Sequence, residues 1–262
     1  MISKPIFDVS VITASFNSAS TIERTIRSVQ AATGGHLIQH IFIDGGSSDE
    51  TLKIIEQYRR EGDIVLSEPD HGISDAFNKG AMLAQGSYIH YLNSDDWADP
   101  EYWDRMIAAS EGFSVPLLHG DLMIIVGDRI YRKASGSADY WKYIDHTMRG
   151  ISHPAILAHR DAFALIGPFS TEFRFTMDLQ WLQRAFDLGY ISRHVPGARI
   201  HFSAGTGASF TPGGVVRESA MLARMRGVSA LTIAKMVAGK HLRISFHRLN
   251  ALLRKKIALL GV

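Results

Sequence analysis

The segment HIFIDGGSSDETLKIIEQYRREG (40–62) holds one complete unit of strand, turn and helix. Its apolar start predicts a buried strand that ends at Asp44. The Gly-Gly-Ser-Ser sequence predicts a turn, and a helix follows from Asp49 to about Arg60. Units of this kind are joined by right-handed crossovers in a parallel sheet, so the segment favours an α/β fold.

The same alternation continues on both sides of this unit. Three more strands and two more helices are predicted, at Asp8–Ser15, 63–70 and 87–96 and at 21–32 and 73–86. In parallel sheets of this kind, ligands bind beyond the carboxyl ends of the strands. Ser15–Asn17, Asp44 and the pair Asp95–Asp96 all fall at such ends, so we expect them to face one crevice.

The pattern changes after Pro100. The predicted elements there are a hairpin, a strand with a short helix, an amphipathic helix and a strand with a glycine-rich loop, over 117–134, 152–167, 178–189 and 198–209. Gly127–Asp128 is the expected tip of the hairpin. We therefore expect a nucleotide-binding half over 1–100 and a mixed half over 101–212 that binds a second substrate.

The composition is that of an ordinary folded protein, and it excludes several kinds of site. Of 262 residues, 46% are hydrophobic and 21% are charged, and there is no cysteine, which excludes disulfide scaffolds, cysteine zinc sites and thiol nucleophiles. GxGxxG is absent from the first strand–helix turn and GxxxxGK[ST] from the whole sequence. The first residues lack a signal-peptide pattern, and no apolar run approaches the ~20 residues of a membrane span. We therefore expect a cytoplasmic location.

The last fifth of the chain is strongly basic. From Gly213 to Val262 there are ten Lys and Arg residues and one acid, Glu218, whereas the residues before it include 18 basic and 25 acidic side chains. In ISFHRLNALLRKKIALL (244–260) the apolar residues gather on one helical face. We expect 213–262 to form a basic amphipathic helical tail on an anionic membrane surface. The alternative is a helix that packs its apolar face on the folded domain or on a second subunit.

Two adjacent carboxylates, Asp95 and Asp96, close the strand in YIHYLNSDDWADP (88–100). Like charges of this kind repel unless a cation or donors compensate them, and no basic residue stands near them in the sequence. Hard carboxylate oxygens suit Mg²⁺ or Mn²⁺, which often take their remaining ligands from substrate phosphates. The pair therefore indicates a cation site, and the alternative is a polar turn that caps the next helix.

Five segments carry a resemblance to a known family. They are VSVITASFNSASTIERTIRSV, FIDGGSSDET, EPDHGISDAFNKG, GSYIHYLNSDDW and FTMDLQWLQRAFDLG, in this order. Over Val9–Ser209 the chain resembles family 2 glycosyltransferases of the GT-A fold, most closely the bacterial exopolysaccharide (colanic-acid-type) subgroup. The resemblance implies a Rossmann-like, mostly parallel sheet flanked by helices over 1–212. The family's commonest D-x-D-D form has Asn93 at its first position here, so only Asp95 and Asp96 carry over.

The resemblance assigns roles on the donor side of the crevice. Asp44 matches the residue that contacts the base of a uridine-type nucleotide, and the backbone near Ala14 and Phe16 would frame that base. Asp75 and Lys79 would line the nucleotide. The same resemblance implies that Asp95 faces the ribose or a metal, that Asp96 binds the metal, and that His201 is a late metal or diphosphate ligand.

On the acceptor side, Asp178 matches the family's catalytic base. An Asp in the first turn of a helix is also favoured by the macrodipole alone, so both interpretations remain open for it. His153 is a candidate for contact with the acceptor or a phosphate. Trp181 is a candidate for stacking on a sugar, with core packing as its alternative.

The resemblance implies an inverting glycosyltransferase with Mn²⁺ or Mg²⁺ as cofactor. It would move a sugar from a nucleotide diphosphate sugar, with a UDP-sugar favoured, to a glycan or a polyprenyl-diphosphate-linked glycan in cell-surface polysaccharide biosynthesis. Its expected place is the cytoplasmic face of the bacterial inner membrane, with no nucleic-acid partner. One alternative is a sugar nucleotidyltransferase, although ITASFNSAS (12–20) lacks the basic residue that such a phosphate loop needs. Another is an inactive nucleotide-sugar-binding module, which would have no use for Asp178.

Overall fold

The computed structural model describes residues 6–110, 117–126, 129–134, 136–145, 151–204 and 212–239. The strands in these ranges form one sheet in the order β3-β2-β1-β4-β8-β6-β9-β5, and β7 pairs with β6. Their bounds are β1 Phe7–Ser15, β2 Ile38–Asp44, β3 Ile64–Ser67, β4 Gly86–Tyr91, β5 Trp97–Ala98, β6 Leu117–Val126, β7 Arg129–Ala134, β8 Ile156–His159 and β9 Arg193–Ser203.

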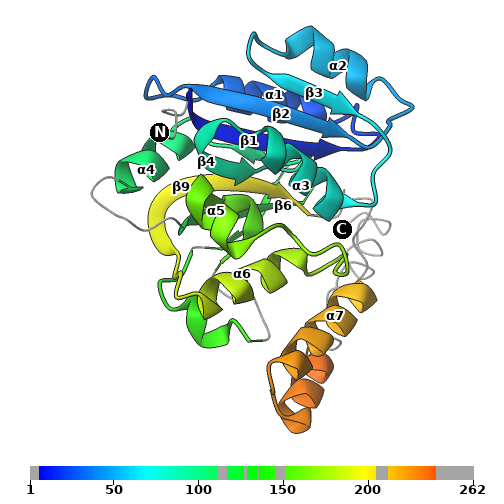
Figure 1. Ribbon diagram of the computed structural model, residues 1–262, viewed down its shortest axis with the longest axis vertical. Helices are drawn as coiled ribbons and strands as arrows, with labels where there is room; N and C mark the ends of the chain where they lie inside the picture. Colours follow the sequence, from blue (N-terminus) through cyan, green and yellow to red (C-terminus); the bar gives the residue numbers. More distant parts are fainter. Residues whose placement is uncertain are drawn as a thin grey trace, which may run out of the picture.

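Helices cover both faces of this sheet. They are α1 Ile22–Gln30, α2 Thr51–Tyr58, α3 Ile73–Leu83, α4 Tyr102–Ser110, α5 Arg160–Ile166, α6 Met177–Asp187 and α7 Pro212–Met225, with 3₁₀ turns η1 Tyr140–Tyr143 and η2 His153–Ala155. A further helix spans 230–239. Figure 1 shows α3, α5 and α6 on the side of the sheet that faces the viewer.

The predicted parallel half is confirmed. β1 pairs in parallel with both β2 and β4, and β2 pairs in parallel with β3. The register sets Ser15 opposite Asp44, and Asp44 opposite Ser67. Three strands therefore end at the same level, and the loops that follow them share one edge of the sheet.

The second half is mixed, as the sequence predicts. β8 is antiparallel to β4 and β6, whereas β9 runs parallel to β6 and antiparallel to β5. The predicted hairpin is formed by β6 and β7, although its expected tip at Gly127–Asp128 lies outside the described residues.

The alternation of apolar residues along β1 explains the two-sided core. Ile12 belongs to the cluster that contains α3, α5 and α6 residues, whereas Val9 and Val11 belong to the cluster beneath α4. All three side chains are fully buried. Each contributes roughly 1.5–3 kcal/mol relative to an exposed position, so both helical layers depend on this central strand.

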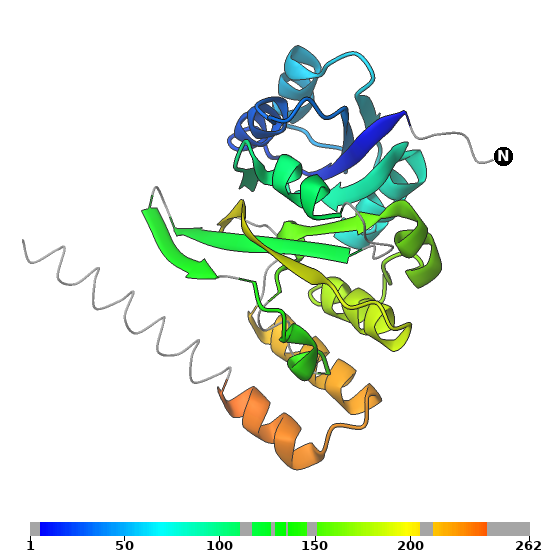
Figure 2. The same ribbon diagram turned by 90° about the vertical axis from the view of Figure 1, so that its left-hand side faces the viewer.

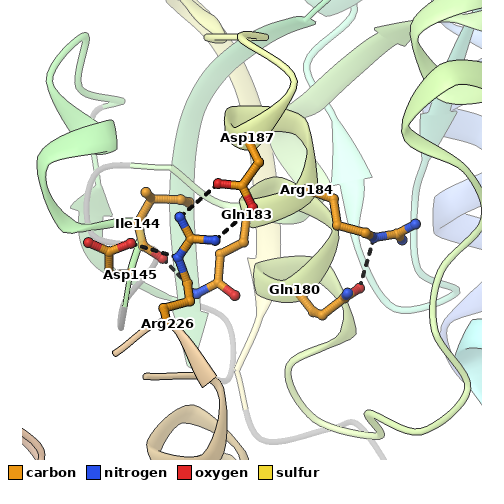
Figure 3. A network of polar contacts seen from close by, with 7 residues as sticks. All are labelled: Ile144, Asp145, Gln180, Gln183, Arg184, Asp187 and Arg226. Atoms are coloured by element: carbon orange, nitrogen blue, oxygen red, sulfur yellow. Dashed lines mark hydrogen bonds and ion pairs between the residues drawn. The ribbon is translucent and has the colours of Figure 1, made fainter. Parts of the chain in front are cut away.

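Helix α7 differs from the free tail that the charge pattern predicts. Arg226, just after α7, forms a bidentate ion pair with Asp187 at the end of α6, with both N–O distances 2.8 Å. Its Nε also lies 2.6 Å from Asp145 Oδ1, and these bonds, above all those to Asp187, raise the pKa of Arg226. Figure 3 shows the guanidinium between the two carboxylates, and Figure 2 shows α7 against α6 and η1.

The chain at the end of α7, within the predicted tail 213–262, therefore contacts the end of α6. The domain boundary at residue 212 and the membrane role of the tail stay predictions. The predicted amphipathic segment 244–260 lies outside the described residues. In the part of the chain that the structure describes, we find no helix long and apolar enough to cross a membrane.

Candidate active site at the carboxyl edge of the sheet

Asp44, the last residue of β2, is fully buried and joins three strand ends. Its Oδ1 accepts hydrogen bonds from Ser15 Oγ at 3.1 Å and Ser47 Oγ at 2.5 Å. Its Oδ2 accepts from Ser67 Oγ at 2.9 Å and from the backbone N–H groups of Gly46 and Ser47 at 3.1 and 2.9 Å. Five donors thus compensate a carboxylate that has no contact with water, and they fix the loop after β2.

The loop after β1 is bonded to the loop after β2. The Asn17 N–H donates to Ser47 Oγ at 2.8 Å, and the Ser18 N–H donates to Thr51 Oγ1 at 2.7 Å. Asn17 adopts a left-handed conformation with φ of 50°, which turns the chain sharply at this point. Phe16 is left 57% exposed beside the fixed loops. An exposed aromatic face at this edge is suited to stacking against a planar ring.

Asp75 and Lys79 lie one turn apart on α3, and their contact with a nucleotide stays a prediction. Lys79 Nζ is 2.8 Å from Glu68 Oε1 and 3.3 Å from Asp75 Oδ2. The His71 N–H donates to Asp75 Oδ2 at 3.1 Å, which is the main cause of the lowered pKa of Asp75. The Lys79 charge is therefore already compensated by carboxylates of the protein.

The carboxylates of Asp95 and Asp96 have different surroundings. Asp96 is fully buried and accepts from the Ser203 N–H and from Asn93 Nδ2, both at 2.9 Å. Asp95 is half-buried. Burial, and secondly the charge of Asp95, raise the pKa of Asp96 to about 8. The raised pKa shows that the two donors to Asp96 do not fully compensate its burial and the neighbouring charge of Asp95.

Arg24 is a residue at this site that sequence reasoning did not identify. Its guanidinium lies 3.7 Å from the centroid of the Trp97 ring, and it donates to the Asp95 carbonyl at 3.0 Å and to Ser203 Oγ at 3.2 Å. Its charge is a minor influence that lowers the pKa of Asp96. Arg24 is 71 residues from Asp95, so no local pattern pointed to it.

His201 also contacts Trp97. Its ring stacks on the indole with 4.9 Å between centroids, and its Nε2 is 2.7 Å from Asp99 Oδ1. Its Nδ1 is buried and has no hydrogen-bond partner among the described residues. The structure therefore pairs His201 with Asp99, and its predicted contact with a metal or diphosphate stays a prediction.

The oxygen donors near Asp95 and Asp96 fit a divalent cation that brings further ligands with it. Within the described ranges, no group of three His, Asp or Glu side chains is arranged to hold a metal by itself. Asn93 Oδ1 is buried there without a partner from the described chain. Two carboxylates and an amide oxygen suit Mg²⁺ or Mn²⁺ when substrate phosphates complete the coordination.

Asp178 lies in the first turn of α6 and lines a small cavity of about 10 Å³ with Tyr91 and His153. Its Oδ1 accepts the Leu179 N–H at 2.7 Å. Burial raises the pKa of Asp178 to about 6, and the charge of Glu218 acts in the same direction. Tyr91 Oη and His153 Nε2 are buried without a partner in the described structure, and the cavity has about the size that one water needs.

His153 and Trp181 also line this cavity, and both belong to an aromatic cluster around it. His153 is 9% exposed, and its ring lies 5.9 Å from that of Tyr91. Trp181 is 3% exposed, stacks on Phe163 and donates from Nε1 to the Gly167 carbonyl at 2.9 Å. Of the two interpretations of Trp181, core packing is the one observed, because no face of the ring is open to a sugar.

Comparison with known proteins identifies related sequences. The family model "Glycosyl transferase family 2" matches residues 10–163. The chain is 30% identical over 182 residues to a "PGL/p-HBAD biosynthesis glycosyltransferase" of Mycobacterium bovis, covering 68% of this chain and 69% of that protein. It is also 30% identical over 101 residues to the "Putative glycosyltransferase EpsH" of Bacillus subtilis, covering 38% and 29%.

Solved structures share the fold. S. aureus TarS 1-349 in complex with UDP-GlcNAc matches 82% of this chain and 66% of its own, with a TM-score of 0.65 and 17% identity. The mannosyltransferase PcManGT from Pyrobaculum calidifontis, in complex with GDP-Man and Mn²⁺, matches 82% and 62%, with a TM-score of 0.60 and 12% identity. This chain spans 39% of the longer TarS structure. The predicted GT-A-like architecture is therefore confirmed.

The Asp44 junction allows a direct test of how this edge is held. We expect Asp44→Asn to lower the free energy of unfolding by about 1–3 kcal/mol. The amide NH₂ of Asn would face N–H or O–H groups that now donate to the carboxylate, so at least one of those groups would lose its acceptor. Urea unfolding measures the change. Asp161→Asn, at a side chain that is 78% exposed, is the control and should stay within about 0.5 kcal/mol of the wild type. Equal stability of both variants would contradict the role of Asp44.

Proposed function

This chain belongs to glycosyl transferase family 2, and we propose that it transfers a sugar from a nucleotide diphosphate sugar to an acceptor hydroxyl with inversion. One observation carries the proposal. Tyr91, the last residue of β4, lines the cavity that contains Asp178, and the turn after β4 carries Asp95 and Asp96. A candidate base and a candidate diphosphate site thus border the same strand end, as transfer between two substrates requires.

For the donor we propose a UDP-sugar. Two related folds have been solved with nucleotide sugars, UDP-GlcNAc in one and GDP-Man in the other, which supports a donor of this class. Phe16 offers an exposed ring beside the backbone of Ala14, where a base can stack. Asp44 fixes this loop through its donors, and a base that donates to Asp44 has to displace one of them. Asp75 and Lys79 line the same side.

We propose that Asp95 and Asp96, with Asn93 Oδ1 beside them, hold Mg²⁺ or Mn²⁺ together with the donor diphosphate. The cation supplies charge neutralisation for the leaving nucleoside diphosphate. The chain's own contribution is to fix the carboxylates through Ser203 and Asn93 and to keep Arg24 close by. His201 is proposed as a later ligand of the metal or the diphosphate.

EDTA should abolish turnover, and added Mn²⁺ or Mg²⁺ should restore turnover. Asp95→Ala and Asp96→Ala should each abolish turnover, because the carboxylates that carry the charge are lost. Release of nucleoside diphosphate from a panel of UDP-glucose, UDP-galactose, UDP-GlcNAc and GDP-mannose measures both effects. Asp161→Asn serves again as the exposed control. Full activity in EDTA would exclude the metal role and leave the transferase proposal in place.

Asp178 is the proposed general base. It removes the proton of the acceptor hydroxyl as the oxygen attacks the anomeric carbon on the face opposite the leaving diphosphate, so no covalent intermediate forms. The raised pKa of about 6 makes it a better proton acceptor than an ordinary Asp, while it is still mostly ionised at pH 7. The helix start is also a favourable place for a carboxylate, so both interpretations of Asp178 are compatible.

Asp178→Asn should reduce turnover by ~10²–10⁴-fold, the usual contribution of a general base. Donor affinity, measured by calorimetry, should be nearly unchanged because Asp178 faces the acceptor. In the wild type, kcat should fall below about pH 6, since a protonated Asp178 cannot accept the hydroxyl proton. Loss of donor binding in a folded Asp178→Asn variant would instead assign Asp178 to the donor site.

We further propose an acceptor at a membrane surface, a glycan or a polyprenyl-diphosphate-linked glycan used in cell-surface polysaccharide biosynthesis. The support is the positive charge of residues 213–262, which include ten basic residues and one acidic residue. Basic residues near an anionic surface contribute about 1 kcal/mol each. On this proposal the protein acts as a peripheral protein on the cytoplasmic face of the inner membrane.

Vesicle co-sedimentation tests the membrane proposal in the full-length chain. The wild type should bind anionic vesicles at low salt and ignore neutral ones. Replacing Arg254, Lys255 and Lys256 with Gln should weaken this binding by about 3 kcal/mol, roughly 100-fold, because three positive charges are removed. Equal binding of both proteins would show that this segment is not the anchor.

A further inference from the structure

Helix α7 contributes a buried carboxylate to the start of α6. Glu218 is 7% exposed, and its Oε1 accepts the Arg174 N–H at 3.1 Å. Its Oε2 accepts the N–H groups of Phe175 and Thr176 at 2.8 and 3.0 Å, and the Thr176 hydroxyl at 3.1 Å. Four donors from three consecutive residues therefore converge on one side chain from another helix.

Three of these donors are backbone N–H groups of the residues that lead into α6, and the fourth is the hydroxyl of Thr176. Thr176 is the N-cap residue of α6, and its hydroxyl is directed to Glu218. A carboxylate at this position also interacts favourably with the positive end of the helix dipole. Glu218 is the one acidic residue in the strongly basic sequence from Gly213 to Val262, and its side chain binds this turn.

The two ends of α6 are both bonded to α7. Glu218 holds the turn before α6, and Arg226 pairs with Asp187 at the last residue of α6. Figure 1 shows the two helices next to each other, and Figure 3 shows the Arg226 end. Asp178 comes two residues after Thr176, so the position of the turn determines the position of the Asp178 carboxylate.

We infer that Glu218 is a positioning residue, which holds the turn 174–176 so that Asp178 meets the acceptor hydroxyl. The inference rests on the proposed function and extends it, because it makes α7 a part of the active centre. A misplacement of about 1 Å at a reacting group can cost ~10²-fold in rate, so loosening this turn has a large expected effect.

The charge of Glu218 acts on Asp178 as well. Among the titratable groups that the described residues set around Asp178, Tyr91 and His153 share its cavity and Glu218 approaches from α7. Burial raises the pKa of Tyr91 and lowers the pKa of His153 to about 3, so both are neutral near pH 7. Glu218 is negative and raises the pKa of Asp178, so removing its charge should lower that pKa.

Two substitutions separate the position of Glu218 from its charge. Glu218→Gln keeps the shape but loses the charge and one acceptor, so kcat should fall at least ~10-fold and the acid limb of the kcat profile should move to lower pH. Glu218→Asp keeps the charge but shortens the side chain, so kcat should fall while the acid limb stays. The donor KM should change less than about twofold in both. The assay is nucleoside diphosphate release from the most active donor of the panel above.

Two control variants test whether lost stability alone explains the result. Arg226→Gln breaks the ion pair with Asp187 and leaves the turn 174–176 unchanged. Glu172→Gln removes an exposed carboxylate two residues before Arg174. Neither variant should shift the pH at which kcat falls on the acid side of its profile. Hydrogen exchange adds a readout that needs no activity, because the amides of 174–176 should exchange faster in Glu218→Gln and not in Arg226→Gln.

The outcomes distinguish this inference from the proposed function. If Glu218→Gln has the same kcat, the same acid limb of the kcat profile and the same amide exchange as the wild type, the inferred role of Glu218 is wrong. This holds even if Asp178→Asn is inactive. Full activity of Asp178→Asn would instead overturn the base and the proposal built on it. If Glu218→Gln does not fold, Thr176→Val removes one of the four donors and should give a smaller loss of kcat with faster exchange at 174–176. Unchanged kcat and exchange in that variant would again count against the inference.

Discussion

Asp44 accepts hydrogen bonds from the ends of β1 and β3 and from the loop that follows its own strand β2. A buried carboxylate is costly unless donors replace its lost water, and here five donors do so. The three strands are consequently held at one level, and the loops that frame the crevice start from fixed points. Phe16, Asp75 and the turn after β4 could not share an edge if these strands ended at different heights.

Three buried or half-buried carboxylates at this edge are compensated to different degrees. Asp44 has five donors, Asp96 has two, and the Asp178 side chain accepts the Leu179 N–H. The pKa values of Asp96 and Asp178 are raised to about 8 and about 6 by burial in the first place. Incomplete compensation is a cost to folding, and it leaves one site suited to a cation and the other suited to accept a proton.

The charged residues of the basic end of the chain differ in ways that composition alone does not reveal. Its first helix, α7, packs on α6 through Glu218 and Arg226, so the acid of this segment and one of its cations are used inside the domain. Apart from Arg217 and Arg224, the remaining basic residues lie later in the sequence, from Lys235 to Lys256, and support the membrane proposal. The net charge of 213–262 therefore includes residues whose charges are paired within the fold, such as Arg226, as well as the residues on which the membrane proposal rests.

The sequence by itself determined the class of fold and the approximate positions of the strand ends, because helix and strand periodicities are local and strand ends can be read from them. Asp44, Asp95 and Asp96 were identified in this way, whereas Asp178 was identified only through the family resemblance, which also supplied the proposed roles. Only the tertiary structure decided that Arg24 stacks beside Asp95, that Trp181 is in the core, and that Glu218 holds the turn before Asp178. These contacts join residues 42 to 71 positions apart, or depend on which face of a helix is covered. No local pattern encodes such pairings, since they follow from the packing of whole elements against one another.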